Sequence, residues 1–319
     1  MPNSQERVKI AVLDDYQNVA LSMADWSVLE GRAAVTVFND HTPDPDAVIA
    51  RLEPFDVVCV MRERTPLTRA IISRLPKLRL IASTAFANAS IDVEAATERG
   101  IEVAHTGYSS TPTIEMTWAL ILGSVRNLAD ENATLRAGGW QRHVGVDLKG
   151  RTLGVLGLGR IGSEVAKIGR AFGMNLIAWS QNLTAERAAE AGASLVSKEE
   201  LFRQADILTI HLVLSHRSRG LVGAPELALM KATSRLVNTS RGPIVVEADL
   251  VAALRDGKIA GAAIDVFDRE PLAVDHPFRS LTNVLATPHI GYVSRDLYER
   301  LYQDTVDNIQ RWLATQKAG

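Results

Sequence analysis

The sequence feature that most constrains the fold is a short glycine pattern near the middle of the chain. An apolar run, Leu153 to Leu156, ends at Gly157, and further glycines follow at positions 159 and 162. A helical pattern of apolar residues comes directly after them. A strand that turns through glycines into a helix aims unpaired backbone N–H groups and the positive end of the helix at one point. The pattern therefore predicts a binding site for the pyrophosphate of a dinucleotide.

The three glycines have different roles in such a turn. Gly157 permits the tight turn, Gly159 lets a phosphate approach the backbone, and Gly162 lets the helix pack closely against the strand. Arg160 and Ile161, in the first turn of the helix, are assigned to the same cofactor site. Glycine-rich turns of other kinds share the bare spacing, so the position between a strand and a helix is what favours a dinucleotide.

The composition is that of an ordinary soluble globular protein, with 46% hydrophobic and 23% charged residues. The length of 319 residues suggests about two domains. A formal net charge of −2 gives no electrostatic argument for binding nucleic acid or an acidic membrane. The single cysteine, Cys59, is predicted to be a buried thiol. Because the N-terminal segment is polar and no apolar run reaches membrane-spanning length, we expect a cytoplasmic enzyme without a signal peptide.

Short apolar runs alternate with helical patterns on both sides of the glycine loop. This alternation predicts parallel sheets with helices on both faces, and therefore an α/β protein. The first domain begins with the strand Val8–Leu13 and is complete before the glycine loop. The turn-rich segment Thr106–Pro112 is expected to join it to the second domain. Helices are predicted over Leu67–Leu75, Thr113–Leu128 and Asp296–Thr315.

Three polar residues stand just beyond strands of the second domain. Arg241, Glu270 and His289 each follow a predicted strand. Ligands of open parallel sheets bind beyond the carboxyl ends of the strands, so all three residues fall on the expected side. Taken singly, each has an ordinary alternative: a surface arginine, a glutamate in a turn or a structural histidine.

The chemistry of these three residue types fits one reaction. Arginine is permanently charged and offers a fork of donors to a carboxylate. A carboxylate beside a histidine stabilises the protonated ring. Such a ring can give a proton to a ketone oxygen as hydride arrives, or take the alcohol proton in the reverse direction. Together with a dinucleotide site, they indicate hydride transfer between a nicotinamide and a 2-keto or 2-hydroxy acid.

The sequence resembles the D-isomer-specific 2-hydroxyacid dehydrogenases over nearly the whole chain. Four motifs carry the resemblance: Gly157-Leu-Gly-Arg-Ile-Gly162, Asn238-Thr-Ser-Arg-Gly242, Asp265-Val-Phe-Asp-Arg-Glu-Pro-Leu272 and Thr287-Pro-His-Ile-Gly291. The resemblance implies two doubly wound parallel-sheet domains. A Rossmann NAD(P)-binding domain, residues 110–294, would be inserted into a flavodoxin-like substrate domain of residues 1–109 that is completed by residues 295–319.

The resemblance also implies roles for individual residues. Arg241 would bind and polarise the substrate, His289 would be the acid/base, and Glu270 would assist His289. Asp265 would receive the carboxamide of the nicotinamide. Six residues outside the glycine loop would line the cofactor: Ser180, His211, Thr239, Ser240, Asp265 and Gly291.

The first domain is expected to bind the substrate. Five consecutive residues resemble the loop whose backbone amides hold the substrate carboxylate: Thr84, Ala85, Phe86, Ala87 and Asn88. Family members usually carry glycine where this chain has Ala85 and Ala87, which leaves the shape of the loop open. Arg62 matches a basic position that can reach an anionic substrate tail. The alternative for Arg62 is a charged loop in solvent.

The cofactor preference depends on the strand after the glycine loop. An acidic residue is expected at its end to bind the ribose hydroxyls of NAD, but the strand ends Trp179-Ser180-Gln181-Asn182. A 2′-phosphate meets no carboxylate there, so NAD and NADP both stay open, with a lean toward NADP. We find no cluster of ligand residues at metal-binding spacing in the sequence, and hydride transfer between carbons requires no metal.

Two other functions share parts of this pattern. A cofactor-regulated binding protein of the same fold, similar to the C-terminal-binding-protein corepressors, would retain the same three polar residues. A formate dehydrogenase would carry glutamine in place of Glu270. The substrate is expected to be a small acid, as in phosphoglycerate dehydrogenases and hydroxypyruvate or glyoxylate reductases. The predicted helix over Thr113–Leu128 is apolar nearly all round, which together with the resemblance predicts a homodimer.

Overall fold

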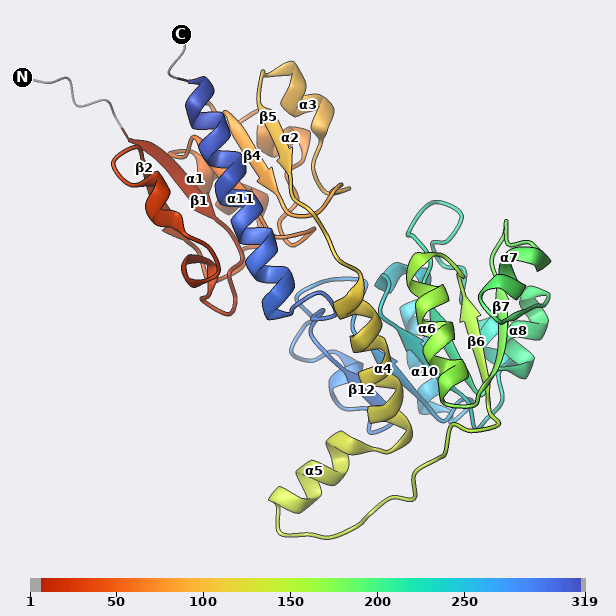
Figure 1. Ribbon diagram of the computed structural model, residues 1–319. Helices are drawn as coiled ribbons and strands as arrows, with labels where there is room; N and C mark the ends of the chain where they lie inside the picture. The colour runs from red at the N-terminus through yellow and green to blue at the C-terminus, as the bar shows by residue number, and fades with distance from the viewer. Residues whose placement is uncertain (1–6, 317–319) are drawn as a thin grey trace, which may run out of the picture. The chain divides into compact units, whose positions relative to one another are not determined.

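The computed structural model describes residues 7–316 of the chain. The chain divides into two compact units (Figure 1). Unit 1 consists of the residues up to Ser109 together with those from Val293 onward, and unit 2 of Ser110–Tyr292. We expected no signal peptide because the N-terminal segment is polar. Most of that segment, residues 1–6, lies outside the described residues. Within the described part, no helix is both long and apolar enough to cross a membrane.

Unit 1 is built on a five-stranded sheet in the order β2-β1-β3-β4-β5, with all neighbouring strands parallel. This is the strand order of flavodoxin-like folds. The strands are β1 (Val8–Val12), β2 (Ala33–Val37), β3 (Val57–Val60), β4 (Leu80–Ser83) and β5 (Glu102–His105). β3 and β4 are buried along their full length, as expected for continuous apolar runs in a sheet that is covered on both faces.

Helices cover both faces of this sheet (Figure 1). They are α1 (Pro45–Leu52), α2 (Arg69–Ile72), α3 (Val93–Glu98), α11 (Arg295–Thr315) and the short 3-10 helices η1 (Ala20–Ser22) and η2 (Trp26–Leu29). α1, α2 and α3 pack on one face around Leu52 and Ile72. α11 packs on β4 and β5, and Asn308 Nδ2 donates a hydrogen bond to His105 O (3.0 Å). The final helix of the chain is therefore part of unit 1.

Unit 2 is built on a seven-stranded parallel sheet in the order β12-β11-β10-β9-β6-β7-β8. Its strands are β6 (Thr152–Leu156), β7 (Asn175–Trp179), β8 (Ser194–Leu195), β9 (Ile207–Ile210), β10 (Arg235–Asn238), β11 (Gly261–Ile264) and β12 (Val284–Ala286). β6, the first of them in the chain, lies between β7 and β9. This is the Rossmann order with one strand added, and its switch point between β6 and β9 is where ligands bind.

Helices also cover both faces of the unit 2 sheet. The helices of this unit are α4 (Thr111–Val125), α5 (Leu128–Arg136), α6 (Arg160–Ala171), α7 (Ala185–Glu190), α8 (Lys198–Gln204), α9 (Ala224–Leu229), α10 (Glu247–Arg255), η3 (Gly242–Ile244) and η4 (Pro277–Arg279). α8, α9 and α10 pack on one face around Phe202 and Leu236. α4 and α6 pack on the other face around Ile121 and Val155.

Two predicted helices differ from the structure. The helix expected over Leu67–Leu75 is confined to Arg69–Ile72. The helix expected over Thr113–Leu128 ends at Val125, and α5 begins after Asn127, whose φ of 52° is left-handed. A left-handed residue cannot continue a right-handed helix, and asparagine tolerates this conformation better than most residues. α5 was not predicted from the sequence, because that segment is mostly polar and has no apolar stripe.

Candidate active site

The glycine loop joins β6 to α6 at the switch point of the unit 2 sheet. Gly157 has a φ of 101°, and a Cβ there would lie 2.7 Å from His211 O. A Cβ on Gly162 would lie 2.1 Å from Gly157 O. Neither position tolerates a side chain, so the turn requires the first glycine and the close packing of α6 on β6 requires the second.

Gly159 differs from the other two glycines because the space in front of it is open. No heavy atom of residues 7–316, apart from its chain neighbours, lies within 4 Å of a Cβ built on Gly159. Gly159 is also the N-cap of α6, whose first N–H groups have no partner within the helix. Arg160, which is exposed, and Ile161, which is half-buried, form the first turn. An open cradle at the positive end of a helix fits the pyrophosphate of a dinucleotide.

The end of β7 lies beside the glycine loop. Gly157 N donates a hydrogen bond to Trp179 O (2.9 Å), and Ser180 is the next residue. Ser180 is half-buried, and Gln181 and Asn182 are exposed. The groups at this strand end are therefore a hydroxyl and two amides. They stand where a carboxylate commonly binds the ribose of NAD.

Arg241 follows β10 in a loop that neighbouring groups hold in place. Asn238 Nδ2 donates to Arg241 O (3.1 Å), and Asn238 Oδ1 accepts from Ser240 N (3.0 Å). The guanidinium of Arg241 donates to Ser240 O (2.8 Å). A Cβ on Gly242 would lie 2.1 Å from the carbonyl carbon of Phe267. The glycine beside Arg241 thus allows this loop to pack tightly against the loop after β11.

His289 and Glu270 form a hydrogen-bonded pair. His289 Nδ1 lies 2.5 Å from Glu270 Oε2, and Glu270 Oε1 accepts from Phe267 N (2.9 Å). The histidine ring meets Tyr292 edge-on, with ring centroids 5.5 Å apart. The side chains of His289 and Glu270 are 25% and 33% exposed, so a ligand in solution can reach them. Because Glu270 engages Nδ1, the ring has a fixed orientation and Nε2 is left to exchange a proton.

Asp265 holds the backbone that carries His289. Its Oδ1 accepts from Thr287 Oγ1 (2.6 Å) and Ile290 N (2.9 Å), and its Oδ2 accepts from Gly291 N (2.7 Å). Burial raises the pKa of the Asp265 carboxyl, and the donated hydrogen bonds act in the opposite direction. His289 has a left-handed φ of 53°, which these contacts on either side keep in place. The structure therefore adds a role for Asp265, support of the histidine turn, that the motif alone did not suggest.

The other residues predicted to line the cofactor lie beyond β9 and β10. Thr239 is buried, with its Oγ1 2.8 Å from Thr117 Oγ1 of α4. Ser240 Oγ donates to the main chain of the loop after β9. His211 Nε2 lies 2.9 Å from Thr209 Oγ1. Burial lowers the pKa of His211 to about 3, so its ring is neutral near pH 7.

In unit 1, the predicted substrate loop follows β4. Thr84, Ala85 and Asn88 are buried, whereas Phe86 and Ala87 are exposed. The loop is thus anchored at both ends and open in the middle.

Ala85 keeps a main-chain conformation that is typical of glycine. Ala85 has a φ of 70°, a conformation that glycine adopts most easily, and its N–H donates to Thr106 Oγ1 (2.8 Å). Alanine therefore keeps a glycine-like turn. The backbone of Arg62 lies against the same loop, because Arg62 N donates to Thr84 Oγ1 (2.7 Å) and Asn88 Nδ2 donates to Arg62 O (2.6 Å).

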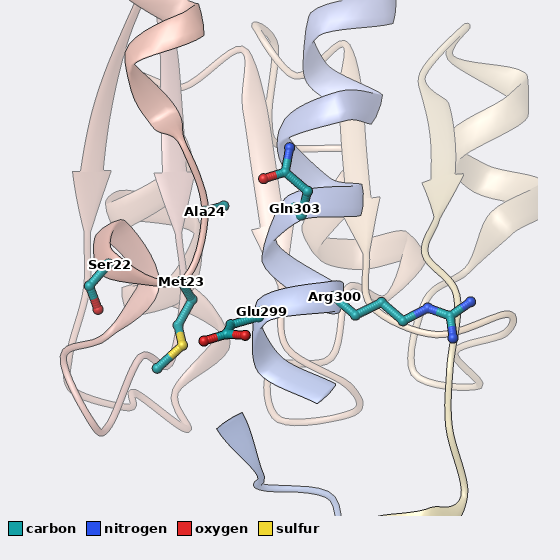
Figure 2. A pocket seen from close by; sticks show the side chains of 6 residues that line it. All are labelled: Ser22, Met23, Ala24, Glu299, Arg300 and Gln303. Carbon is teal, nitrogen blue, oxygen red and sulfur yellow. The ribbon is translucent and has the colours of Figure 1, made fainter. Parts of the chain in front are cut away.

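A hollow of about 450 Å³ lies elsewhere on unit 1 (Figure 2). It is lined by Ser22, Met23, Ala24, Glu299, Arg300 and Gln303. Figure 2 shows Arg300 pointing away from Met23, and a Cβ on Gly107 would lie 2.5 Å from Arg300 Nη2. The guanidinium is thus packed over the backbone of unit 1, and the lining includes none of the predicted site residues. We do not assign the hollow to the substrate.

Unit 1 also contains a buried polar cluster that was not predicted from the sequence. Asp14, His41 and Thr65 meet just beyond β1. The only signal in the sequence was the pair Asp14-Asp15 at the end of an apolar strand, because the two partners of Asp14 lie 27 and 51 residues away in the chain. Among residues 7–316, no group of three or more His, Cys, Asp or Glu side chains is arranged to hold a metal ion.

The fold and the site define a class of protein. A glycine cradle at a Rossmann switch point, with an arginine and a Glu–His pair beyond neighbouring strands, is typical of NAD(P)-dependent oxidoreductases that act on hydroxy or keto acids. Residues 118–291 match the family described as D-isomer specific 2-hydroxyacid dehydrogenase, NAD binding domain. The chain belongs to the D-isomer-specific 2-hydroxyacid dehydrogenases.

Individual relatives agree with this assignment. The chain is 45% identical over 287 residues to the glyoxylate reductase of Aeropyrum pernix, covering 86% of this chain and 85% of the relative. It is 38% identical over 288 residues to the D-3-phosphoglycerate dehydrogenase of Methanocaldococcus jannaschii, covering 89% of this chain and 53% of the relative. The crystal structure of a phosphoglycerate oxidoreductase from Vibrio cholerae has a TM-score of 0.92 and 38% identity, covering 97% of this chain and 99% of that chain.

These comparisons confirm the family, the α/β fold class and the enzymatic nature predicted from the motifs. They do not favour the corepressor-like alternative, because the relatives are named as enzymes. The protein is an NAD(P)-dependent D-2-hydroxyacid dehydrogenase.

Proposed function

We propose that the protein interconverts a small D-2-hydroxy acid and its 2-keto acid through Arg241, Glu270 and His289. The observation that carries this assignment is the 2.5 Å contact between His289 Nδ1 and Glu270 Oε2. A histidine held through one ring nitrogen presents the other nitrogen in a defined direction, as an acid/base requires. The single cysteine, Cys59, is a free buried thiol, which suits the reducing conditions of the cytoplasm, where we propose that the protein acts.

His289 exchanges the proton of the reaction. In the reductive direction, Nε2 of His289 gives a proton to the C2 carbonyl oxygen of the keto acid. The nicotinamide dinucleotide, when bound, supplies the hydride to C2. Glu270 stabilises the protonated ring before the transfer and holds its orientation afterwards. In the oxidative direction, Nε2 takes the proton of the C2 hydroxyl group.

Arg241 binds the substrate in this proposal. Its guanidinium is charged at every working pH and can donate two parallel hydrogen bonds to a carboxylate. It also stabilises the charge that develops on the C2 oxygen. Asn238 and the tight packing at Gly242 support the backbone of Arg241, so the guanidinium is presented by a fixed loop.

The loop Thr84–Asn88 binds the substrate carboxylate in this proposal. The support is the left-handed turn at Ala85, because such a turn directs successive backbone N–H groups toward one point. Arg62, which is held against this loop, is proposed to meet an anionic substrate tail. Substrate choice then depends on the tail, which is where the substrates named for the relatives differ: glyoxylate has none and phosphoglycerate carries a phosphate.

The cofactor is proposed to bind at the glycine loop, with Gly159 and the first turn of α6 against the pyrophosphate. The open space at Gly159 supports this placement. The hydroxyl of Ser180 beside the loop supports a lean toward NADP, because no carboxylate repels a 2′-phosphate there.

The protein is proposed to be a homodimer, with α5 and the segment after it, in place of α4, as the contact surface. Most apolar side chains of α4 are buried within unit 2. In contrast, α5 buries no side chain, and α5 and the segment after it extend away from the sheet of unit 2 (Figure 1). Leu135, Trp140 and Val144 in this region are 58%, 73% and 96% exposed. A second copy of the chain would cover these apolar side chains.

Replacement of the histidine tests the proposed mechanism. We expect His289→Ala to lower kcat by about 10²–10⁴-fold, the usual contribution of general acid–base catalysis. The dissociation constant for NAD(P)H, measured by fluorescence, should change little. His276→Ala is a matched control, because His276 Nε2 also contacts a glutamate, Glu247 Oε1 at 2.9 Å, but lies outside the proposed site. A His289→Ala enzyme with near-normal kcat would remove His289 from the mechanism.

A further inference from the structure

The three central strands of the unit 1 sheet end in the same unusual way. Two residues beyond β1, β3 and β4 the chain reaches Asp14, Arg62 and Ala85, with φ values of 57°, 54° and 70°. A left-handed conformation costs a non-glycine residue about 1 kcal/mol or more and persists only where surrounding contacts hold it. Because β1, β3 and β4 are neighbours in the sheet, the three turns form one edge, which includes the proposed substrate loop.

Asp14 is the polar centre of this edge. Its side chain is 2% exposed. Its Oδ2 accepts from Thr65 Oγ1 (2.6 Å), and its Oδ1 lies 2.9 Å from His41 Nδ1. Its backbone carbonyl accepts from Arg64 Nη1 (2.6 Å). A carboxyl group buried to this degree requires such partners, so Asp14 ties two consecutive residues of the loop after β3 to the end of β1.

The loop after β3 is held from its other side as well. Arg62 N donates to Thr84 Oγ1, and Arg62 O accepts from Asn88 Nδ2. The four residues Arg62–Thr65 therefore lie between two anchors, Asp14 on one side and the proposed substrate loop on the other. Loss of either anchor removes a direct hydrogen bond that holds this loop in place.

The two arginines of this loop are held differently. Arg64 donates to Tyr298 Oη (3.1 Å) as well as to Asp14 O, and its guanidinium carbon lies 4.5 Å from the ring centroid of Tyr16. Arg64 is thus integrated into unit 1. Arg62 has its guanidinium carbon 5.2 Å from the ring centroid of Tyr108, and its Nη2 is 3.6 Å from the carboxylate of the adjacent Glu63. Both guanidinium groups therefore stack on tyrosine rings of unit 1.

We propose that Asp14, His41 and Thr65 are positioning residues that set selectivity for the substrate tail by fixing the Arg62–Thr65 loop. The cluster contacts the Arg62–Thr65 loop through the Asp14 carboxyl and the Asp14 backbone carbonyl. It therefore affects binding of substrates whose tail meets Arg62 and leaves the chemistry at C2 unchanged. This inference rests on the proposed function of Arg62.

Thr65→Val tests the inference, because it removes the hydroxyl and keeps the shape of the side chain. The measured quantity is the ratio of kcat/KM for 3-phosphohydroxypyruvate to kcat/KM for glyoxylate, which has no tail. If the enzyme does not turn over 3-phosphohydroxypyruvate, this acid is tested as an inhibitor of glyoxylate reduction. Its inhibition constant then replaces its kcat/KM in the comparison. We expect the ratio to fall about tenfold or more through KM or the inhibition constant, a loss typical of one buried hydrogen bond. Both glyoxylate constants should stay within about twofold.

Three further variants separate positioning from general damage. Thr65→Ser keeps the hydroxyl and should restore the ratio. Ser234→Ala removes another buried hydroxyl, in unit 2, and should leave the ratio unchanged. The double variant Arg62→Gln with Thr65→Val should have the selectivity of Arg62→Gln alone, because the cluster acts through Arg62. If Thr65→Val does not fold, Thr65→Ala takes its place, since it places no methyl group against the carboxyl of Asp14.

The outcomes distinguish the role of the Asp14 cluster from the proposed role of Arg62. If Arg62→Gln lowers the ratio but Thr65→Val does not, the cluster inference is overturned and the proposed role of Arg62 stands. Equal losses on both substrates, or additive effects in the double variant, also overturn the inference. If Arg62→Gln leaves the ratio unchanged, or if the wild-type enzyme does not bind the phosphorylated acid at all, both the role of Arg62 and the inference fail.

Discussion

Thr287 offers a way to weaken the support of His289 without changing the histidine or its glutamate partner. The Thr287 hydroxyl donates to Oδ1 of Asp265 over 2.6 Å, and Asp265 is 1% exposed. Thr287→Val removes this donor and keeps the shape of the side chain. Two backbone donors, Ile290 N and Gly291 N, remain on the carboxyl group. The variant therefore removes one of the three hydrogen bonds that the Asp265 carboxyl accepts from the segment around His289.

The size of the effect follows from the nature of this hydrogen bond. A hydrogen bond to a charged group contributes about 1.5–3 kcal/mol, so we expect the free energy of unfolding to fall by about 2 kcal/mol at neutral pH. If the whole loss appeared as misplacement of His289 in the transition state, kcat would fall about 30-fold, which is an upper bound.

The effect on stability should depend on pH. Burial raises the pKa of Asp265 above the usual 3.8, so the folded state binds this proton more tightly than the unfolded chain does. The stability contributed by the protonated carboxyl is present at acidic pH and is lost as the pH rises through the raised pKa. Loss of the Thr287 donor raises that pKa further. Thr287→Val should therefore destabilise the protein more at neutral pH than at mildly acidic pH.

Urea unfolding at both pH values and steady-state kinetics at neutral pH test this reasoning. Thr287→Ser keeps the hydroxyl and should behave like the wild type. Equal destabilisation at both pH values would refute the link to ionised Asp265. A normal kcat in a clearly destabilised Thr287→Val enzyme would show that the histidine turn does not depend on Asp265.

Three further predictions concern the substrate, the cofactor and assembly. Arg241→Lys keeps the charge but loses the fork, so kcat/KM for a 2-keto acid should fall by about tenfold or more, and an unchanged value would place the carboxylate elsewhere. Ser180→Asp restores a ribose-binding carboxylate and should shift the kcat/KM ratio toward NADH by about tenfold or more, equivalent to about 1.4 kcal/mol; a ratio that does not move would show that Ser180 does not face the ribose. Light scattering should report a dimer that becomes monomeric when Leu135 and Trp140 are both replaced by glutamate, and a monomeric wild type would contradict the proposed assembly.

The sequence by itself determined the elements whose causes are local. β6 contains the apolar run Leu153 to Leu156, and β7 ends at Trp179 as predicted, because a parallel strand covered on both faces is a continuous apolar segment between turn residues. The glycine loop was readable for a similar reason: Gly157 and Gly162 are required by backbone geometry that the next few residues define. The C-terminal end of α4 was not readable, because it depends on the left-handed conformation of a single residue, Asn127.

Tertiary structure decided which distant side chains meet. Thr65 reaches Asp14 because β3 lies beside β1 in the sheet, although 51 residues separate the two side chains in the chain. The same holds for Asp265. The motif suggested that Asp265 binds the cofactor, but β11 and β12 are neighbouring strands, and Asp265 therefore also accepts hydrogen bonds from the turn that carries His289. Hydrophobic periodicity records which face of a strand is buried, but it carries no information on strand order. Partners across the edge of a sheet are set by that order, and so the positioning groups of this enzyme became visible only in the folded chain.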